Sequence, residues 1–307
     1  MSTKFLDPTN DVAFKKIFGT EKNKDILIHF LNDILVFKNK EPIREVQFLK
    51  TVQDPEIASQ KTSIVDILCK DEKGSSYIVE IQVARTSGFE KRAQYYASKV
   101  YCSQAGIGDK YPNLKEVIFI AIADFIMFPN KKRYKSDHVI LDRESHEHDL
   151  QDFSFTFIEL PKFKKKIEQI STLQEKWCYF FKHAKETSPE EFAKIIGKDV
   201  IIKKAYTELD RFHWTAEALQ SYEQSEKKIK DYVSSLDYKY DEGLAAGERK
   251  NQIAIAENML QERLPLKVIV KVTALSLEEV KKIQASIKKT SSKSVRSVKS
   301  KAPSKKK

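Results

Sequence analysis

Two carboxylates are brought together by a hairpin pattern in the stretch TSIVDILCKDEKGSSYIVEIQVAR, residues 62–85. It contains two apolar, β-branched segments, predicted as strands at Ile64–Cys69 and Tyr77–Val83, with a polar turn between them. If these strands pair antiparallel about residue 73, Asp66 lies opposite Glu80, because 66 and 80 sum to twice 73. Residues opposite each other in such a pair have Cβ atoms about 4.5–5.5 Å apart. The sequence therefore predicts two neighbouring carboxylates on one face of the hairpin.

The chemistry that such a pair favours is metal binding. Gln82 follows Glu80 on the same face, because side chains alternate along a strand. Two carboxylates in an apolar setting repel each other, and one of them would be driven to protonate. A divalent cation removes that cost, and oxygen ligands suit Mg²⁺ or Mn²⁺. The alternative is a hairpin whose polar face meets water, but the apolar runs on both faces favour the metal site.

Charge is concentrated at the end of the chain. The 307 residues carry a net charge of +11, and residues 288–307 hold nine Lys or Arg and no acid, so the remainder is close to neutral at +2. A basic tail suits the phosphate backbone of a nucleic acid. A solvated, disordered end is the alternative, and the two are compatible.

The cysteines and the apolar segments restrict the class of protein. The three cysteines, Cys69, Cys102 and Cys178, have no CxxC spacing, so we expect neither disulfides nor a zinc site, and the pattern fits the cytoplasm. The N-terminus has no apolar core typical of a signal peptide, and the sequence has no run of 18 apolar residues. We therefore expect no membrane span.

The segments around the hairpin predict a mixed α/β region. The order is helix, strand, strand, strand, helix and strand, with a continuous apolar run at the last strand that is typical of burial on both faces. The expected elements are a helix from Asp11 to the stop at Gly19, a helix at Lys24–Leu35, strands at Glu45–Val52 and in the hairpin, a loop at Gln53–Gln60, a helix from Phe89 to about Gln104, and strands at Val117–Asp124, Tyr134–Asp142 and Phe153–Leu160.

From about residue 164 onward the pattern is helical. Expected helices are Leu173–Lys185, Pro189–Gly197, Val200–Asp210, Trp214–Tyr238, Lys250–Leu264 and Ser276–Ile287, with a break at Gly243 and Gly247. The long helix at Trp214–Tyr238 has a partial apolar seam of the coiled-coil kind, which is compatible with a homo-oligomer through the helical region. The last helix, capped by Ser276, suits either a DNA-reading helix-turn-helix or a plain helical hairpin.

These motifs together resemble a known family. DPTNDVAFKKIFG near the N-terminus, the hairpin SIVDILCKDEKGSSYIVEIQVAR and the following RAQYYASKVY resemble the Rpn family of recombination-promoting nucleases, also described as PD-(D/E)XK nuclease family transposases. The resemblance implies a restriction-endonuclease-like α/β core with a mixed sheet flanked by helices, followed by an α-helical C-terminal region. We divide the chain into a nuclease-like domain at residues 1–163, a helical region at 164–287 and a basic disordered tail at 288–307.

The resemblance also implies site residues. In that superfamily the acids of the second and third strands bind the metal, which assigns Asp66 and Glu80 as metal ligands. The usual lysine of the superfamily, two residues later, is replaced by Gln82, which is the residue that the Rpn pattern itself has there. The replacement leaves open which group, if any, supplies positive charge. Arg92 and Lys99 on the next helix are candidates, and Asp11 matches an acidic residue of the first helix that often completes such sites.

The implied activity is a Mg²⁺- or Mn²⁺-dependent endonuclease that hydrolyses DNA, linked to recombination or mobile elements. Metal ions can activate a water and stabilise a pentacovalent phosphate. One alternative is a catalytically inactive DNA-binding or assembly protein that retains the fold. Another is a structural interaction protein built around Trp214–Tyr238, whose oligomerisation would not depend on metal.

Other chemistry-bearing residues have simpler explanations. His138, His146 and His148 lack cysteine partners, and a metal site there is the minority interpretation. Tyr95, Tyr96 and Tyr101 lie on the predicted helix and are expected to pack in the core or along the helix, with stacking on bases the minority interpretation. Asp124 ends an apolar strand, where it either joins a site or caps the turn.

Overall fold

The structure is a computed structural model that describes residues 4–35, 41–50, 52–53, 63–106 and 110–287. Most of the loop predicted at Gln53–Gln60 lies outside the described residues, and so does the basic tail at 288–307.

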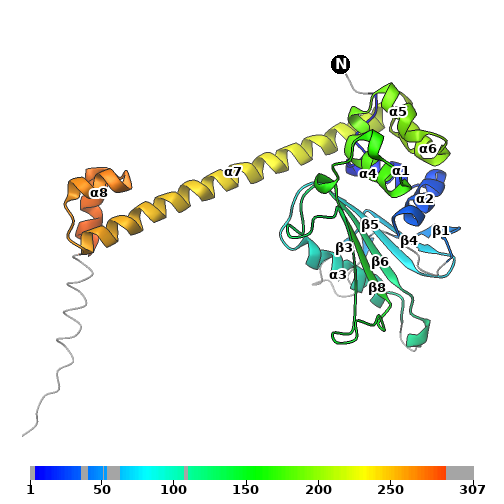
Figure 1. The fold of residues 1–307 in the computed structure, drawn as a ribbon, viewed down its shortest axis with the longest axis horizontal. Coiled ribbons are helices and arrows are strands. Elements are labelled where there is room, and N and C mark those ends of the chain that lie inside the picture. The colour runs from blue at the N-terminus through cyan, green and yellow to red at the C-terminus, as the bar shows by residue number, and fades with distance from the viewer. Residues whose placement is uncertain (1–3, 36–40, 51, 54–62, 107–109, 288–307) are drawn as a thin grey trace, which may run out of the picture. The chain divides into compact units, whose positions relative to one another are not determined.

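A mixed six-stranded sheet forms the centre of the fold, as predicted (Figure 1). Its strand order is β1–β4–β5–β6–β8–β7, in which β5, β6 and β8 are parallel to one another and the other pairs are antiparallel. The strands are β1 Val46–Phe48, β4 Ile67–Asp71, β5 Ser76–Gln82, β6 Val117–Ala123, β7 Lys135–Val139 and β8 Phe153–Glu159. A separate two-stranded ribbon pairs β2 Val52–Gln53 with β3 Ser63–Ile64.

The hairpin register is confirmed, but its first strand is divided. Ile67 pairs with Val79 and Leu68 with Ile78, so the paired residue numbers sum to 146, the value that the predicted register requires. The single strand predicted at Ile64–Cys69 is wrong, because β3 ends at Ile64 and β4 begins at Ile67. The strand is interrupted at Asp66, whose side chain accepts the backbone N–H of Ile81 in place of a ladder carbonyl. The strand predicted at Glu45–Val52 is likewise divided into β1 and β2.

Helices cover both faces of the sheet (Figure 1). Helix α3 Phe89–Cys102 packs on the face that includes Leu68 and Ile78. The helices α1 Asp11–Phe18, α2 Lys24–Ile34, α4 Leu173–His183 and α6 Val200–Leu209 form the core on the opposite face. Strand β6 is buried along its whole length between the two cores, as its apolar run predicted.

The remaining elements of this region are short. Helix α5 Pro189–Ile196 begins at Ser188, which forms a reciprocal cap with Glu191. Single 3-10 turns lie at Glu21–Asn23, Tyr111–Asn113, Leu160–Lys162, Ile167–Gln169, Ala184–Glu186 and Arg211–His213.

Contacts divide the chain into one unit of residues 1–230 and a second of residues 231–307. The first unit extends beyond the boundary predicted at residue 163, because the helices that follow it contribute to the same core as α1 and α2. Trp177 of α4 and Tyr206 of α6 are fully buried there. These later helices are therefore part of the compact body that carries the sheet.

A single helix, α7 Ala216–Gln261, replaces the two helices predicted on either side of Gly243 and Gly247, so the predicted break is wrong. Glycine in a helix costs about 1 kcal/mol relative to alanine, which neighbouring helix formers can offset. Here the glycines flank Leu-Ala-Ala and are followed by Glu-Arg-Lys, all good helix formers.

The second unit has its own small core. The end of α7, helix α8 Leu266–Thr273 and a helical segment at residues 277–287 surround the buried side chains of Ala256, Ile269 and Val280. Ser276 caps the last segment as predicted, because its hydroxyl accepts from the backbone of Glu279 at 3.3 Å. DNA reading by this pair of helices stays a prediction.

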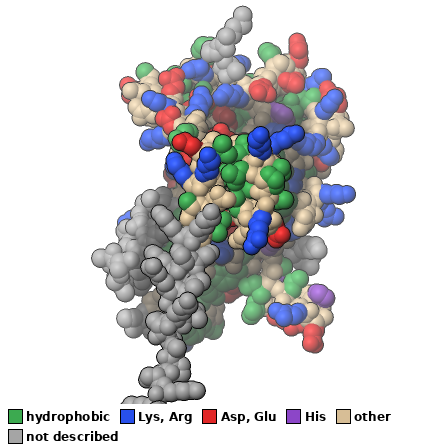
Figure 2. Space-filling view, turned by 90° about the vertical axis from the view of Figure 1, so that its left-hand side faces the viewer, with side chains coloured by type: hydrophobic (Ala, Val, Ile, Leu, Met, Phe, Trp, Pro, Cys, Tyr) green, Lys and Arg blue, Asp and Glu red, His purple; other side chains and the backbone are tan. Residues whose placement is uncertain are grey.

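On the surface, Lys and Arg side chains are interspersed with Asp, Glu and hydrophobic side chains on the face shown in Figure 2. Among the described residues, no helix combines the length and the apolar character needed to cross a membrane.

Candidate active site

Asp66 and Glu80 are held together by reciprocal contacts between backbone and side chains. The Asp66 N–H donates to Glu80 Oε1 at 3.1 Å, and Asp66 Oδ2 accepts the N–H of Ile81 at 3.0 Å. Glu80 is buried, and the Asp66 side chain is only 17% exposed. The pairing predicted from residue numbers therefore brings the two predicted ligands into direct contact, beside the core that α3 covers.

Helix α1 adds two further charged groups. The Asn10 side chain caps the helix by accepting the N–H of Val12 at 2.9 Å, and its amide donates to the backbone of Tyr222 at 3.4 Å. The first turn of α1 then presents Asp11, and the next turn presents Lys15. The start of α7, which contains Tyr222, thus anchors the end of α1 that faces the carboxylates.

Lys15, which is not among the site residues expected from the sequence, connects α1 to the hairpin. Its Nζ lies 2.8 Å from Asp11 Oδ1 and 3.4 Å from Asp66 Oδ1. The signal was available, because Asp11 and Lys15 are four residues apart on a predicted helix and so share a face. Because Asp11 was expected at the site, Lys15 could have been expected there as well.

Arg92 and Gln82 form a second arm of the site. Arg92 Nη2 donates to Gln82 Oε1 at 2.5 Å, while the Gln82 amide donates to the carbonyl of Ala84 at 2.8 Å. The guanidinium lies over the Phe89 ring at 4.8 Å. Gln82 therefore has both ends of its amide engaged, and a cation does lie beside the position where the superfamily has lysine.

Burial dominates the electrostatics of the carboxylate pair. Desolvation raises the pKa of Asp66 above its usual range, although the Ile81 N–H and the Lys15 ammonium act in the opposite direction. Desolvation and the Asp66 charge raise the pKa of Glu80, against the effects of the Asp66 N–H, Arg92 and Lys15. In Lys15 burial lowers the pKa, but the carboxylates of Asp11 and Asp66 outweigh it and the net shift is upward.

The donor set fits a divalent cation in its chemistry. Each carboxylate has one oxygen fixed by a backbone N–H, which leaves Asp66 Oδ1, now facing the Lys15 ammonium, and Glu80 Oε2 for a cation. Hard oxygen ligands of this kind suit Mg²⁺ or Mn²⁺. Within the described residues, no group of three or more His, Cys, Asp or Glu side chains is arranged around a common point. Two protein ligands are compatible with Mg²⁺, which keeps several waters.

Other candidates lie at the margin of this site or away from it. Lys99 is two helical turns beyond Arg92, about 10 Å along the helix. The N–H of Asp124 donates to the carbonyl of Gln82 at 2.9 Å and continues the strand pairing, while its own side chain is exposed.

The predicted packing of the tyrosines is confirmed for two of them. Tyr96 is buried in the core under α3, and Tyr101 donates to Asp152 at 2.6 Å. Tyr95 is 41% exposed and does not pack in this core.

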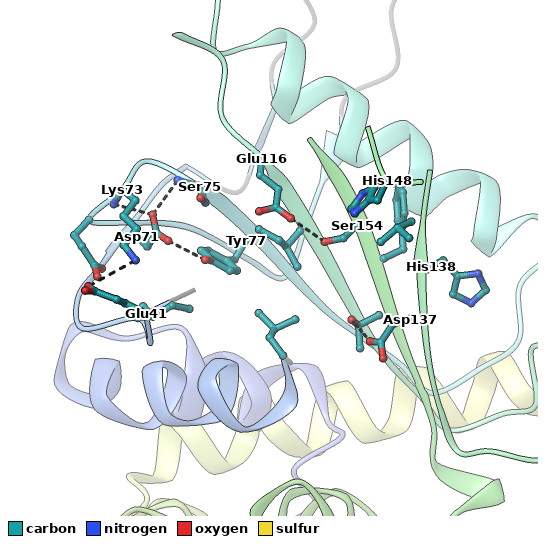
Figure 3. A pocket seen from close by; sticks show the side chains of 17 residues that line it. Glu41, Asp71, Lys73, Ser75, Tyr77, Glu116, Asp137, His138, His148 and Ser154 are labelled. Carbon is teal, nitrogen blue, oxygen red and sulfur yellow. Dashed lines mark hydrogen bonds and ion pairs between the residues drawn. The ribbon is translucent and has the colours of Figure 1, made fainter. Parts of the chain in front are cut away.

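A cavity of about 840 Å³ lies on the opposite face of the sheet, near the start of β5 and β6 (Figure 3). Asp66 and Glu80 do not line it. Its buried carboxylate, Asp71, is engaged by the Tyr77 hydroxyl at 2.8 Å and by the N–H groups of Lys73 and Ser75, both at 2.9 Å. These contacts stabilise the turn of the hairpin.

The histidines noted in the sequence do not converge. His138 and His148 line this cavity, and His138 contacts Lys131 at 3.2 Å and Ser136 at 3.1 Å. His146 is exposed and has a left-handed backbone. The histidine metal site, already the minority interpretation, gains no support from these positions.

Comparison with known proteins identifies a family whose model matches the chain. The family model for PD-(D/E)XK nuclease family transposases matches residues 8–239, well over half of the chain. The match includes the hairpin, α1 and α3, which carry all the residues of the candidate site. No curated protein and no solved structure matches the chain.

Proposed function

This chain belongs to the PD-(D/E)XK nuclease family transposases, and on that premise we propose that it is a divalent-metal-dependent endonuclease that hydrolyses phosphodiester bonds in DNA. The observation that carries the proposal is the buried pair of Asp66 and Glu80 at the predicted position of the metal ligands. A pair of buried carboxylates is costly without a compensating cation, so its presence favours a binding role over a structural one.

Asp66 and Glu80 would hold Mg²⁺ or Mn²⁺ through the oxygens that do not accept backbone N–H groups. When bound, the ion supplies a water of lowered pKa and stabilises charge on the phosphate. The backbone bonds from Asp66 to Glu80 and from Ile81 to Asp66 keep both carboxylates oriented before the ion arrives. That orientation lowers the cost of assembling the site.

Gln82 and Arg92 have supporting roles in this proposal. The Gln82 carbonyl oxygen accepts from Arg92, so Gln82 fixes the guanidinium beside the carboxylates instead of acting as a base, which an amide cannot do. Arg92 lowers the pKa of Glu80 and so favours the ionised form that a metal requires. Asp11 holds the Lys15 ammonium beside Asp66.

The proposal also covers the substrate, the biological role, the location and the self-association of the protein. We take DNA as the substrate, and a link to recombination or mobile elements, from the family. We take a cytoplasmic location from the cysteine pattern. Self-association through α7 is supported by Val233 and Leu236, which are about 40% exposed and three residues apart on one face.

Plasmid cleavage with Mg²⁺ or Mn²⁺ tests the proposal. We expect cutting by the wild type that EDTA abolishes and that Asp66→Asn and Glu80→Gln each reduce by at least about a hundredfold. The matched control is Glu21→Gln, which removes an exposed carboxylate of an ordinary ion pair and should leave cutting unchanged. No cutting together with no Mn²⁺ binding in calorimetry would favour the inactive DNA-binding protein instead. Cutting that survives Asp66→Asn would assign the activity to another site.

A further inference from the structure

The proposed reaction would be assisted by a fixed cation besides the metal. Attack on a phosphodiester adds negative charge to the phosphate oxygens in the transition state, and fixed positive groups stabilise that charge. The superfamily lysine is replaced by Gln82, whose neutral amide is already engaged at both ends. A fixed positive charge at this site would therefore come from another part of the chain.

Two cations approach the carboxylate pair, and their environments differ. The Arg92 guanidinium is bonded to Gln82 and covered by the Phe89 ring, and its Nε is buried. These contacts hold the Arg92 guanidinium in place and leave it little freedom to meet a substrate. Arg92 is therefore better placed to position the side chains of the site than to contact DNA.

Lys15 has the properties that Arg92 lacks. Its side chain is 42% exposed, so a phosphate in solution can reach it. Its ammonium contacts Asp66 at 3.4 Å, which places it directly beside the proposed metal ligand. The bond to Asp11 at 2.8 Å keeps it there if the contact with Asp66 is given up to a metal. A lysine on a flexible stem can move between such partners.

We infer that Lys15 is the cationic residue of this active site and contacts the phosphate oxygens during cleavage. The inference rests on the proposed nuclease function and adds a residue to it. In the free protein the Lys15 ammonium pairs with Asp11 and Asp66, and with substrate present it turns to the phosphate while Asp11 retains it. Lys15 thus supplies the positive charge that the superfamily has at the position of Gln82.

The test separates metal binding from cleavage in three variants of the full chain. We expect Lys15→Met to bind Mn²⁺ within about threefold of the wild-type affinity in calorimetry, since lysine is not a ligand, while cleavage falls by about a hundredfold or more. Lys15→Arg should recover part of the activity because it keeps the charge. The matched control is Lys24→Met, because Lys24 also bridges two carboxylates, Glu21 at 2.7 Å and Glu45 at 2.9 Å, and should change neither quantity.

Each outcome decides the inference. If Lys15→Met cuts as well as the wild type, Lys15 is not the cationic residue. If it loses Mn²⁺ binding and cleavage together, Lys15 only maintains the shape of the carboxylate pair, and the inference is wrong. Failure of the wild type to bind Mn²⁺ or to cut would overturn the proposed function itself. The wild type is therefore measured before the variants.

Discussion

Asp66 and Glu80 contact each other through a backbone N–H and a carboxylate, 3.1 Å apart, and not through their two carboxylates. The arrangement fixes one oxygen of Glu80 while both side chains lie in a poorly solvated place. The free protein thus keeps two acids whose ionisation burial disfavours. This relationship has a consequence for stability that needs no substrate to measure.

Glu80→Gln should stabilise the metal-free protein at pH 8. The pKa of Asp66 is raised to about 6 and that of Glu80 to about 8, so between about pH 4 and these values the folded state binds more protons than the unfolded chain. Stability therefore falls as the pH rises through this range. A glutamine removes one of these acids and keeps an oxygen to accept the Asp66 N–H. We expect a gain of the order of 1–3 kcal/mol at pH 8 and little change at pH 4 in urea unfolding.

The same measurement with Mn²⁺ provides the control. The metal should stabilise the wild type and not Glu80→Gln, because only a ligand that binds the folded state shifts unfolding. A stability curve with the same pH slope in both proteins would show that Glu80 ionises as freely in the folded chain as in the unfolded one.

Gln82→Lys, which restores the superfamily residue, should destabilise this protein. The new ammonium would lie where Gln82 Oε1 now accepts from Arg92 at 2.5 Å, so a favourable bond becomes a repulsion between cations. We expect a loss of about 1–3 kcal/mol in urea unfolding. In an Arg92→Met background the same change should cost clearly less, and equal costs in the two backgrounds would contradict the coupling.

Asn10→Ala should reduce both stability and cleavage. Loss of the cap on α1 costs about 1 kcal/mol, and it also loosens the turn that presents Asp11 and Lys15. The matched control is Thr172→Ala, which removes the comparable cap of α4, where the threonine hydroxyl accepts from the Glu175 N–H at 3.2 Å. Helix α4 carries none of the candidate site residues. Thermal unfolding should report a loss for both variants, and the larger one for Asn10→Ala because it also removes the bond to the Tyr222 carbonyl. Plasmid cleavage should fall only for Asn10→Ala.

The elements that the sequence predicts well are those whose signal is local. The apolar run at Val117–Asp124 indicated a strand buried on both faces, and β6 is that strand. The position of Asp66 opposite Glu80 followed from the symmetry of the hairpin about its turn. In both cases the pattern of apolar residues along one segment is enough to predict the element.

The features that the sequence did not reveal depend on how elements pack. The interruption at Asp66 arises because its carboxylate reaches the N–H of Ile81, a choice between side chain and backbone that strand propensity does not describe. The contact of Lys15 with Asp66 requires the orientation of α1 relative to the sheet, which the helical pattern leaves open. The family resemblance indicated Asp11, and only the packing of α1 adds Lys15.

Helix α7 continues without a break through two glycines. Gly243 and Gly247 lie within the helix, and a Cβ added at either one meets no heavy atom within 4 Å outside the nearby helix backbone. Alanine at each position should therefore stabilise the helix by about 0.5–1 kcal/mol, since it reduces the freedom of the unfolded chain without a clash. Hydrogen exchange of the amides around residues 240–250 should slow, and cleavage should not change.

Ala245→Gly is the matched control for these changes, because it lies between the two glycines on an exposed part of the same helix and should speed exchange by a similar factor. A different result would be informative about assembly. If Gly243→Ala speeds exchange and lowers the molar mass in light scattering, the added methyl group must be disrupting close packing against a second copy of the chain. The glycines would then mark the interface through which α7 self-associates, and the exposed Val233 and Leu236 would extend it.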